Sequence, residues 1–528
     1  MIPKTALQGK ERIKILLVRP PGHLWPLINE SDNWLLPLGL PALAAYIRRE
    51  MEGVEIRILD CLAEKVGWRS LEKAISDYQP DVFGVGDLLI YMFEGLRAVS
   101  IAKRLNPDCV TLAGGHAHSH LPEYVLRNQP GLDYVVRFEG EATTVDLLKT
   151  LREGGDVANV RSIAYRDGRE VVLTGPRPLI ADLDSLPMPA YDLVHTEKYA
   201  PYGVMFPKAI TIQGARGCPH NCSYCAWTAM EGEHRGDDPH AMSMVPRLRM
   251  RSVGRVIEDI DYLYREKGIR YLFWAEGTWN HNHAWVDELC TEILKRDYKG
   301  LGWWAFVRAD KILEQEELGI LPKMVKAGFR HALIGGERPD DAELREVGKD
   351  GLRGDALLRC SHLLARKYPV VVRFSTFLTG IRSETPQSMQ RLVQYAVDAK
   401  LDFAPFHPLT PFPGTPLYDE ASKKGWIEET DFSKFDMFKP VMPSEHMTRE
   451  EISAATLKAQ LEFVSKQPLR YLAGFFSPVP LRRRLRWYLT VKMLRVVLRD
   501  LWLSIRGKKK FEGFGAIEKL WKPAWYDT

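Results

Sequence analysis

The chain has 528 residues, of which 45% are hydrophobic and 27% are charged, and its formal net charge is +5. This length excludes a single core, because domains usually hold roughly 100–200 residues, and the composition is that of an ordinary soluble globular protein. The 7 cysteines are too sparse for a disulfide framework, and residues 1–18 lack the layout of a secretory signal peptide. We therefore expect a cytoplasmic protein with two large domains and a smaller one.

Strands and helices alternate through the first part of the chain. Strands separated by helices of this length imply right-handed crossovers and a parallel sheet with both faces covered. We therefore predict an α/β protein whose residues 1–155 form a doubly wound, Rossmann-like domain. The predicted strands are 12–19, 54–59, 81–86, 109–113 and 133–137, and the predicted helices include 37–50, 92–105 and 120–128.

A linker and a second series of strands and helices follow. Residues 156–207 are predicted to begin with a hairpin around Asp167 and Gly168, which suit a tight turn, and to continue as a proline-rich loop. Six strand and helix units over 208–425 predict an open, partial (βα)6 barrel of the TIM type, with its chemistry at the carboxyl ends of the strands. Its predicted strands are 208–214, 269–276, 301–308, 329–336, 370–378 and 401–408, and its helices include 253–265, 310–327 and 385–399.

Three cysteines stand close together in the stretch GARGCPHNCSYCAW, residues 214–227. Cys218, Cys222 and Cys225 form a C-x3-C-x2-C array on a loop after the first barrel strand, and thiolates so spaced can converge on one metal centre. A zinc site needs a fourth protein ligand, which His220 would have to supply. A [4Fe–4S] cluster held by three thiolates instead leaves one iron open to another ligand, and we favour this interpretation.

The array, with Tyr224 before its last cysteine, resembles the signature of the radical SAM superfamily. The resemblance implies that the open iron binds S-adenosylmethionine (SAM). An electron from a donor such as flavodoxin or ferredoxin would then cleave SAM to a 5′-deoxyadenosyl radical. It further implies SAM contacts from Tyr224, from Glu276 near the amino group, from Arg308 near the carboxylate and from Glu337 near a ribose hydroxyl. Structural salt bridges explain the three charged residues equally well.

A doubly wound domain before such a barrel resembles the cobalamin-binding subgroup of this superfamily. Leu62 stands where the cobalamin mutases have the histidine that binds cobalt, so the resemblance implies cobalt without that ligand. Phe138 stands where the family's G-E-G-E turn begins with glycine. The alternative is a doubly wound domain that binds another ligand or none. Cobalamin contacts are implied at the strand ends for Gly86, Asp87, Gly114, Gly115, His116, Gly140 and Glu141.

Three histidines, His116, His118 and His120, alternate along one predicted loop. Histidines on a flexible loop are more often solvated or hydrogen-bonded than metal-bound, so we do not expect them to coordinate cobalt.

The C-terminal region, 426–528, is predicted to be helical and basic. Residues 466–510 hold 13 Lys and Arg against Asp500 alone, a formal charge of +12, which leaves −7 for the rest of the chain. A spanning helix needs about 20 nearly uncharged residues, which this region lacks. We expect 482–510 to pack an apolar face on the barrel, with peripheral contact to an anionic membrane as the second interpretation and nucleic-acid binding a distant third. Its apolar residues include Trp487, Leu494, Leu498 and Leu501.

The layout of the chain is similar to the group of the anaerobic magnesium-protoporphyrin IX monomethyl ester cyclase, with DFSKFDMFKPVM (431–442) as the nearest match in the tail. The resemblance implies an enzyme that uses a [4Fe–4S] cluster, SAM and cobalamin to modify an unactivated carbon of a small molecule. Methyl transfer is the first expectation, and oxidative ring closure on a tetrapyrrole is the alternative. The alternative from another class is a zinc-stabilised, non-catalytic nucleic-acid-binding protein. Trp274, Trp279, Trp303 and Trp304 would line a water-poor cavity or form the core.

Overall fold

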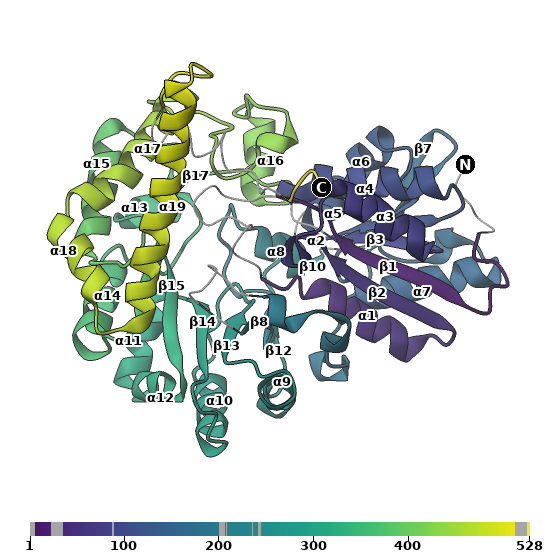
Figure 1. The fold of residues 1–528 in the computed structure, drawn as a ribbon, viewed down its shortest axis with the longest axis horizontal. Coiled ribbons are helices and arrows are strands. Elements are labelled where there is room, and N and C mark those ends of the chain that lie inside the picture. Colours follow the sequence, from purple (N-terminus) through teal and green to yellow (C-terminus); the bar gives the residue numbers. More distant parts are fainter. Residues whose placement is uncertain are drawn as a thin grey trace.

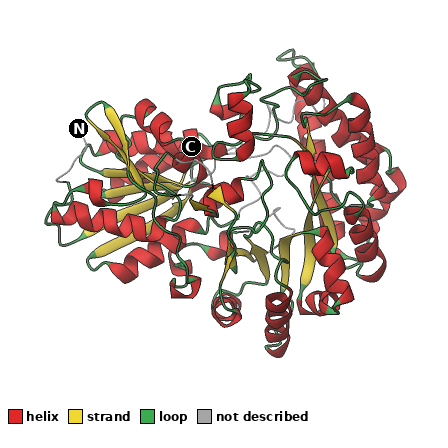
Figure 2. Cartoon of the chain, turned by 180° about the vertical axis from the view of Figure 1, so that it is seen from behind, coloured by secondary structure: helices red, strands yellow, loops and turns green. Residues whose placement is uncertain are grey.

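The computed structural model contains an N-terminal sheet, a half-barrel and a layer of C-terminal helices (Figures 1 and 2). In Figure 1 the N-terminal sheet lies on the right and the half-barrel on the left, and both units have helices on their outer faces. The structure describes residues 6–22, 35–86, 89–199, 206, 208–234, 236–240, 244–512 and 525–528. None of the helices in these ranges is both long enough and apolar enough to cross a membrane.

The N-terminal sheet has the strand order β2-β1-β3-β4-β5-β6-β7, and β1 to β5 are parallel. Helices α1 and α7 cover one face and α3, α4 and α6 the other, so the strands are apolar on both sides. The predicted doubly wound sheet is confirmed, and its strand order reverses between β1 and β3. The elements are β1 (Ile13–Arg19), α1 (Gly39–Glu50), β2 (Val54–Asp60), α2 (Cys61–Glu64), α3 (Trp68–Tyr78), β3 (Val82–Gly86), α4 (Met92–Leu105), β4 (Val110–Gly114), α5 (His116–His120), α6 (Pro122–Asn128), β5 (Tyr134–Val136) and α7 (Gly140–Glu153).

The hairpin predicted at the start of the linker extends this sheet. β6 (Ile163–Asp167) pairs antiparallel with β5, and β7 (Glu170–Leu173) pairs antiparallel with β6. The sheet therefore continues past residue 155, and the hairpin belongs to it rather than to a separate linker. The division of the chain at 155, 207 and 425 stays a prediction.

The half-barrel has six parallel strands in sequence order, β8-β13-β14-β15-β16-β17, which confirms the predicted partial barrel. The helix predicted over 310–327 is divided into α11 and α12, because Gly319 adopts a left-handed conformation with φ +72° between them. The strands are β8 (Ala209–Ile212), β13 (Tyr271–Trp274), β14 (Gly302–Val307), β15 (Phe329–Glu337), β16 (Val372–Thr379) and β17 (Phe406–Pro408). The helices are α9 (Val253–Arg265), α10 (His283–Lys295), α11 (Ala309–Glu317), α12 (Ile320–Ala327), α13 (Asp341–Glu346), α14 (Ala356–Lys367), α15 (Pro386–Asp398) and α16 (Pro416–Lys423).

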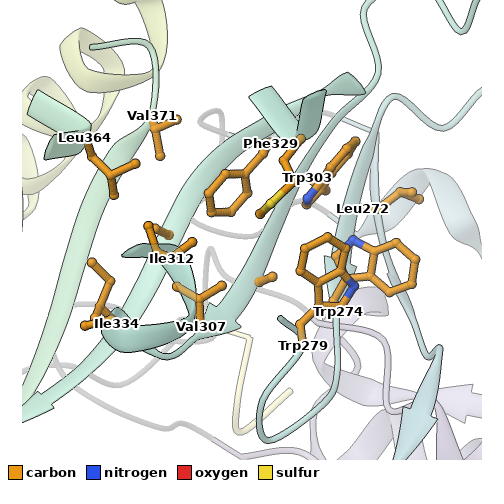
Figure 3. Close-up of a cluster of buried hydrophobic side chains, with 14 of the residues drawn as sticks. Leu272, Trp274, Trp279, Trp303, Val307, Ile312, Phe329, Ile334, Leu364 and Val371 are labelled. Atoms are coloured by element: carbon orange, nitrogen blue, oxygen red, sulfur yellow. The ribbon is translucent and has the colours of Figure 1, made fainter. Parts of the chain in front are cut away.

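The tryptophans of the half-barrel are core residues. Trp274, Trp279 and Trp303 are at most 3% exposed and pack in the layer between the strands and the outer helices (Figure 3). Trp304 faces the opposite, concave side, where its ring centroid lies 4.6 Å from that of Phe273. Neighbouring residues of a strand point to opposite faces, which explains why Trp303 and Trp304 serve different layers. Of the two predicted roles for these tryptophans, core packing is the one that this arrangement supports.

The C-terminal region is helical, as predicted, with α17 (Arg449–Ser465), α18 (Pro468–Ala473), a 3-10 turn η8 (Gly474–Phe476) and α19 (Pro480–Ile505). Leu485 and Leu489 of α19 pack against the concave face of the half-barrel, and Arg482 forms an ion pair with Asp402 at 2.7 Å. The predicted packing of this region on the barrel is therefore confirmed, but the prediction of which face of α19 contacts the barrel was wrong. The four apolar residues singled out from the sequence are 42–54% exposed, namely Trp487, Leu494, Leu498 and Leu501.

Residues 525–528 return to the helices of the N-terminal sheet. The backbone carbonyl oxygen of Thr528 accepts a hydrogen bond from the Arg69 N–H at 3.0 Å, at the start of α3. The Tyr526 ring meets the Trp68 ring edge-on, with centroids 6.2 Å apart. The chain therefore contacts its first unit again after it has formed the half-barrel.

Candidate functional site

The three cysteines lie on one loop between β9 (Ala215–Arg216) and α8 (Ala226–Glu231). Cys218 is buried, and its Sγ lies 3.5 Å from the Thr278 Oγ1, just beyond β13. Burial and the neighbouring Cys222 raise the pKa of Cys225 to about 12, so an uncompensated thiolate is disfavoured there. A cationic metal centre reverses this balance, and the loop therefore has the donor chemistry of a thiolate-bound cluster.

His220 lies within the cysteine loop, where the zinc interpretation would need it as the fourth ligand. Its ring lies edge-on to that of His281, with centroids 5.4 Å apart, and burial lowers the pKa of His220 to about 4. Its Nε2 is buried without a partner among the described atoms, so its position alone does not separate the two kinds of site. In the described part of the chain, no three His, Cys, Asp or Glu side chains are arranged as ligands of a single metal ion. The thiolates of a [4Fe–4S] cluster each bind a different iron and so lie farther apart than ligands of one ion, which is compatible with this arrangement.

Glu276 lies at the carboxyl end of β13, as predicted, and holds the strand that leads to the cysteines. Its Oε1 accepts hydrogen bonds from the backbone N–H groups of Gly214 and Ala215, the latter at 3.2 Å. Its Oε2 is buried and has no hydrogen-bond partner among the described residues. A buried acceptor without a partner is costly, and an ammonium group such as the SAM amine would satisfy it. The residue therefore fits the contact that the resemblance implies.

Arg308 follows β14, with its guanidinium 2.9–3.3 Å from the Asp310 carboxylate. Its Nη1 is buried and has no partner in the described part of the chain, so part of the guanidinium remains for a second carboxylate. Burial raises the pKa of Cys222, while Arg308 and Lys349 act to lower it, which indicates that both cations lie near the cysteine loop. Arg308 is recognisable from the sequence by its place at the end of a strand, whereas its partner Asp310, only two residues away, was not predicted.

Glu337 ends β15 and ties that strand to the cysteine loop. It accepts hydrogen bonds from Lys349 Nζ at 3.0 Å, from Thr376 Oγ1 at 3.3 Å and from the Tyr224 hydroxyl. The aromatic residue of the cysteine array is thus bound to the fourth strand of the half-barrel. Burial and the neighbouring Glu337 raise the pKa of Tyr224, which keeps the hydroxyl protonated as the donor of this contact.

The residues named for cobalamin gather at the carboxyl edge of the N-terminal sheet. Gly86 and Gly114 are paired in the register of β3 and β4, so both lie at this edge. Gly115 takes φ +91° directly before α5, which only glycine adopts readily. Gly140 begins α7, and Asp87 lies outside the described residues. A backbone edge rich in glycine permits the close approach of a flat ligand.

The three histidines are placed differently from the prediction. His116, His118 and His120 lie on α5 rather than on a flexible loop, and each is at most 4% exposed. His120 Nε2 lies 2.7 Å from the carbonyl oxygen of Ala229 in α8. Both ring nitrogens of His118 and the Nε2 of His116 have no partner among the described atoms. Burial lowers the pKa of His116 and of His118 to about 4, so both are neutral at pH 7.

The position that would carry a cobalt-binding histidine is closed by a hydrophobic side chain. Leu62 is fully buried on α2. Asp60, two residues before it, accepts from Arg19 at 2.7–2.8 Å, from the Tyr199 hydroxyl at 2.9 Å and from the N–H groups of Leu62 and Ala63 at 3.2 Å. Both oxygens of the Asp60 carboxylate therefore accept hydrogen bonds from these donors. Neither Leu62 nor Asp60 therefore replaces the cobalt-binding histidine that the cobalamin mutases have at this position.

A buried network of ion pairs joins the sheet to the cysteine loop. Glu139 and Glu141, which follow β5, accept from Arg216 at 2.9 Å and 2.5 Å, and Glu139 also accepts from Arg249 at 2.9 Å. Arg216 is only two residues before Cys218. Sequence analysis named Glu141 for cobalamin but missed its partner, because the two are 75 residues apart. We call these four residues the interdomain network.

Two family models match the two α/β units. The B12 binding domain model matches residues 24–148, and the radical SAM superfamily model matches residues 212–396. The first match lies within the N-terminal sheet, and the second runs from the end of β8 into α15. Fold and site thus define an enzyme that combines a radical SAM half-barrel with a B12-binding sheet.

The chain thus carries a B12 binding domain and a radical SAM domain, and its cofactors are a [4Fe–4S] cluster, SAM and cobalamin. It is 29% identical over 453 residues to an uncharacterised methyltransferase of Pyrococcus horikoshii, covering 85% of this chain and 92% of that protein. It is 28% identical over 448 residues to the anaerobic magnesium-protoporphyrin IX monomethyl ester cyclase of Rubrivivax gelatinosus, covering 83% and 75% of the two chains. Its fold is similar to that of the radical SAM methyltransferase TsrM from Kitasatospora setae, solved with cobalamin and a [4Fe–4S] cluster, with a TM-score of 0.60 at 20% identity over 79% and 76% of the chains. The predicted family is confirmed.

Gly217 sets the path of the loop directly before Cys218. Its φ is +83°, and a Cβ there would lie 1.7 Å from the Arg247 carbonyl oxygen. We expect Gly217→Ala to lower the free energy of unfolding by about 3 kcal/mol or more and to reduce the iron bound per chain after reconstitution. Gly236→Ala is the matched control, because its φ is +80° but its Cβ would meet open space. Equal losses in the two variants, in urea unfolding and in iron content, would show that backbone strain alone is responsible.

Glu276→Gln should change how stability depends on pH. Burial raises the pKa of Glu276 from 4.5 to about 8, so the folded protein keeps this proton up to a higher pH than the unfolded chain. The free energy of unfolding of the native, cofactor-free protein should therefore fall as the pH rises from about 4.5 to about 8. The variant lacks this titration, so its free energy of unfolding should fall by about 4 kcal/mol less than that of the native protein over this pH range. Urea titrations at pH 5 and pH 8.5 measure the difference, and parallel losses in both proteins would contradict it.

Proposed function

We propose that this enzyme transfers a methyl group to an unactivated carbon of a small-molecule substrate, at the interface between the half-barrel and the N-terminal sheet. The observation that carries this proposal is the interdomain network. In it, Arg216 connects the cysteine loop directly to two glutamates beside the carboxyl edge of the N-terminal sheet, where we propose that cobalamin binds. Two cofactor sites tied together through buried ion pairs are suited to a reaction that uses both. When bound, the cluster supplies the electron that cleaves SAM, and the cobalamin supplies a methyl carrier.

The residues of the chain have the following roles in this proposal. Cys218, Cys222 and Cys225 hold the cluster, while Glu276 accepts from the SAM amine through its free oxygen. Arg308 donates to the SAM carboxylate through its free nitrogen. Tyr224 and Glu337 fix the loop against β15, and Glu337 also lies where a ribose hydroxyl would be bound. The buried positions of these groups exclude water from a reactive radical.

The products formed from SAM test the proposal. Purified protein, reconstituted anaerobically with iron, sulfide and cobalamin, is incubated with SAM and either dithionite or reduced flavodoxin. Methyl transfer requires S-adenosylhomocysteine to accumulate together with 5′-deoxyadenosine. 5′-Deoxyadenosine without S-adenosylhomocysteine, in the presence of a modified substrate, would contradict methyl transfer.

The second candidate function is an oxidative ring closure on a tetrapyrrole. The similarity to the cyclase of Rubrivivax gelatinosus over 83% of the chain favours it. 5′-Deoxyadenosine as the sole SAM product, together with conversion of a magnesium-protoporphyrin monomethyl ester, would establish it. For either function we propose a cytoplasmic enzyme that receives electrons from a flavodoxin or ferredoxin, and neither function requires a nucleic-acid partner.

A further inference from the structure

Helix α19 has two apolar faces, and only one of them is covered. Its inner face holds the buried residues Leu485, Leu489 and Val496, and the two leucines pack against the half-barrel. In Figure 1 α19, drawn in yellow, runs along the half-barrel with no other element in front of it. Its other apolar residues recur every three or four positions, which places them along one side of the helix over about 27 Å. This outer stripe consists of Trp487, Val491, Leu494, Leu498, Leu501, Trp502 and Ile505, which are 38–77% exposed.

The outer stripe continues onto α18 and η8. Phe475 packs against Trp487 with ring centroids 4.8 Å apart, and the hydroxyls of Tyr471 and Thr490 lie 2.8 Å apart. These contacts fix α18 and η8 beside the first half of α19. Three further apolar residues of this segment, Leu469, Leu472 and Phe476, are 56–84% exposed. So many exposed apolar residues on adjoining elements mark an interaction site.

The exposed charged residues of 466–510, the segment that holds the outer stripe, are all positive. Asp500 is the single acidic residue of 466–510, and it is buried and paired with Lys509 at 2.5 Å. The exposed side chains beside the stripe include Arg483, Arg484, Arg495, Arg506, Lys508 and Lys510. A second copy of this surface would bring like charges together, and a nucleic acid would leave the apolar stripe in water. An anionic lipid surface satisfies both the apolar and the basic residues.

We propose that the outer face of α18 and α19 binds the surface of an anionic lipid bilayer. The apolar stripe enters the boundary between headgroups and acyl chains, and the arginines lie at the level of the phosphates. The inner face of α19 stays on the half-barrel, held by its buried leucines and by the ion pair of Arg482 with Asp402. Binding therefore needs no rearrangement of the helix, and it holds the catalytic half-barrel against the membrane. This inference does not depend on which reaction the enzyme catalyses.

Sedimentation of the full chain with lipid vesicles tests the proposal. Vesicles of equal parts phosphatidylglycerol and phosphatidylcholine should bind the protein at least about 10-fold more tightly than pure phosphatidylcholine vesicles. Raising the salt from about 0.1 M to about 0.5 M should weaken the binding, because the arginines are screened. Equal binding to both kinds of vesicle, or no binding to either, would overturn the proposal.

Variants locate the contact. The double variant Leu494→Glu/Leu498→Glu should lose at least about 50-fold in vesicle affinity, and Arg484→Gln/Arg495→Gln at least about 10-fold. Leu318→Glu is the matched control, because this exposed leucine lies between α11 and α12, away from the stripe. The vesicle affinity of this variant should equal that of the native protein. All substituted side chains are exposed, so thermal unfolding should be nearly native and loss of folding can be separated from loss of binding. If Leu494→Glu/Leu498→Glu binds vesicles with native affinity, the proposal is overturned. It is also overturned if the native chain is a dimer in solution and this double variant is a monomer, because the stripe would then be a dimer interface.

Discussion

Replacing Cys222 by alanine should abolish the formation of 5′-deoxyadenosine from SAM under reducing conditions. Loss of a residue that merely orients a metal ligand costs about 10–100-fold, so loss of a ligand should reduce the rate by more than about 100-fold. The reason lies in the proposed site, where the three buried or half-buried thiols of the loop would be the protein ligands of the cluster. The rate is measured by quantifying 5′-deoxyadenosine after anaerobic reconstitution, together with the iron bound per chain.

Cys290→Ala is the control for this variant. Cys290 is fully buried in α10 among core residues, away from the cysteine loop. We expect its replacement to cost about 1 kcal/mol of stability through the small cavity and to leave iron content and SAM cleavage unchanged. A Cys222→Ala protein that cleaves SAM at the native rate would refute the assignment of the cluster.

Replacing Arg216 by methionine should have the largest effect on stability. Its guanidinium serves two buried glutamates, and removing one partner of a buried ion pair costs about 3–5 kcal/mol, because the remaining charges stay desolvated. Burial tends to raise the pKa of Glu141, but Arg216 outweighs burial and leaves this pKa lowered. In the native protein this stabilisation is therefore present at neutral pH and is lost as the pH falls through the lowered pKa of Glu141. Urea unfolding at pH 7 measures the loss.

Two comparisons separate the interdomain network from a general effect of charge removal. Arg104→Met breaks an ion pair with Glu72 whose side chains are 59% and 42% exposed, so it should cost at most about 1 kcal/mol. The double variant Arg216→Met/Glu141→Gln should be less unstable than the sum of its two single variants, because the unpaired carboxylate is removed as well. Additive losses would show that the two residues do not act as a pair.

The sequence predicts those parts of the fold that local patterns determine. The helices 92–105 and 253–265 have the predicted bounds, because their apolar residues recur at helical spacing and α9 is capped by Ser252. The hairpin β6-β7 could be predicted as a hairpin but not as part of the sheet. Nothing in its own residues specifies β5 as its partner.

The candidate site shows the same division between local and distant information. The cysteines and Tyr224 are recognisable because they are adjacent in sequence, and Glu276, Arg308 and Glu337 because each ends a strand. The partners that fix them are distant in sequence, as with Glu141 and Arg216. The face of α19 was mispredicted for a related reason. Both of its sides are apolar, so its residues do not determine which side meets the barrel.

The return of residues 525–528 to α3 has a consequence for how cobalamin could be loaded. The two halves of the molecule are connected by the chain that leads from β7 to β8, by the contacts of Thr528 and Tyr526 with Arg69 and Trp68, and by the interdomain network. Wide separation of the halves would expose the buried ion pairs of that network to water, which is costly. We therefore expect the corrin to enter through a local gap while these ion pairs stay intact.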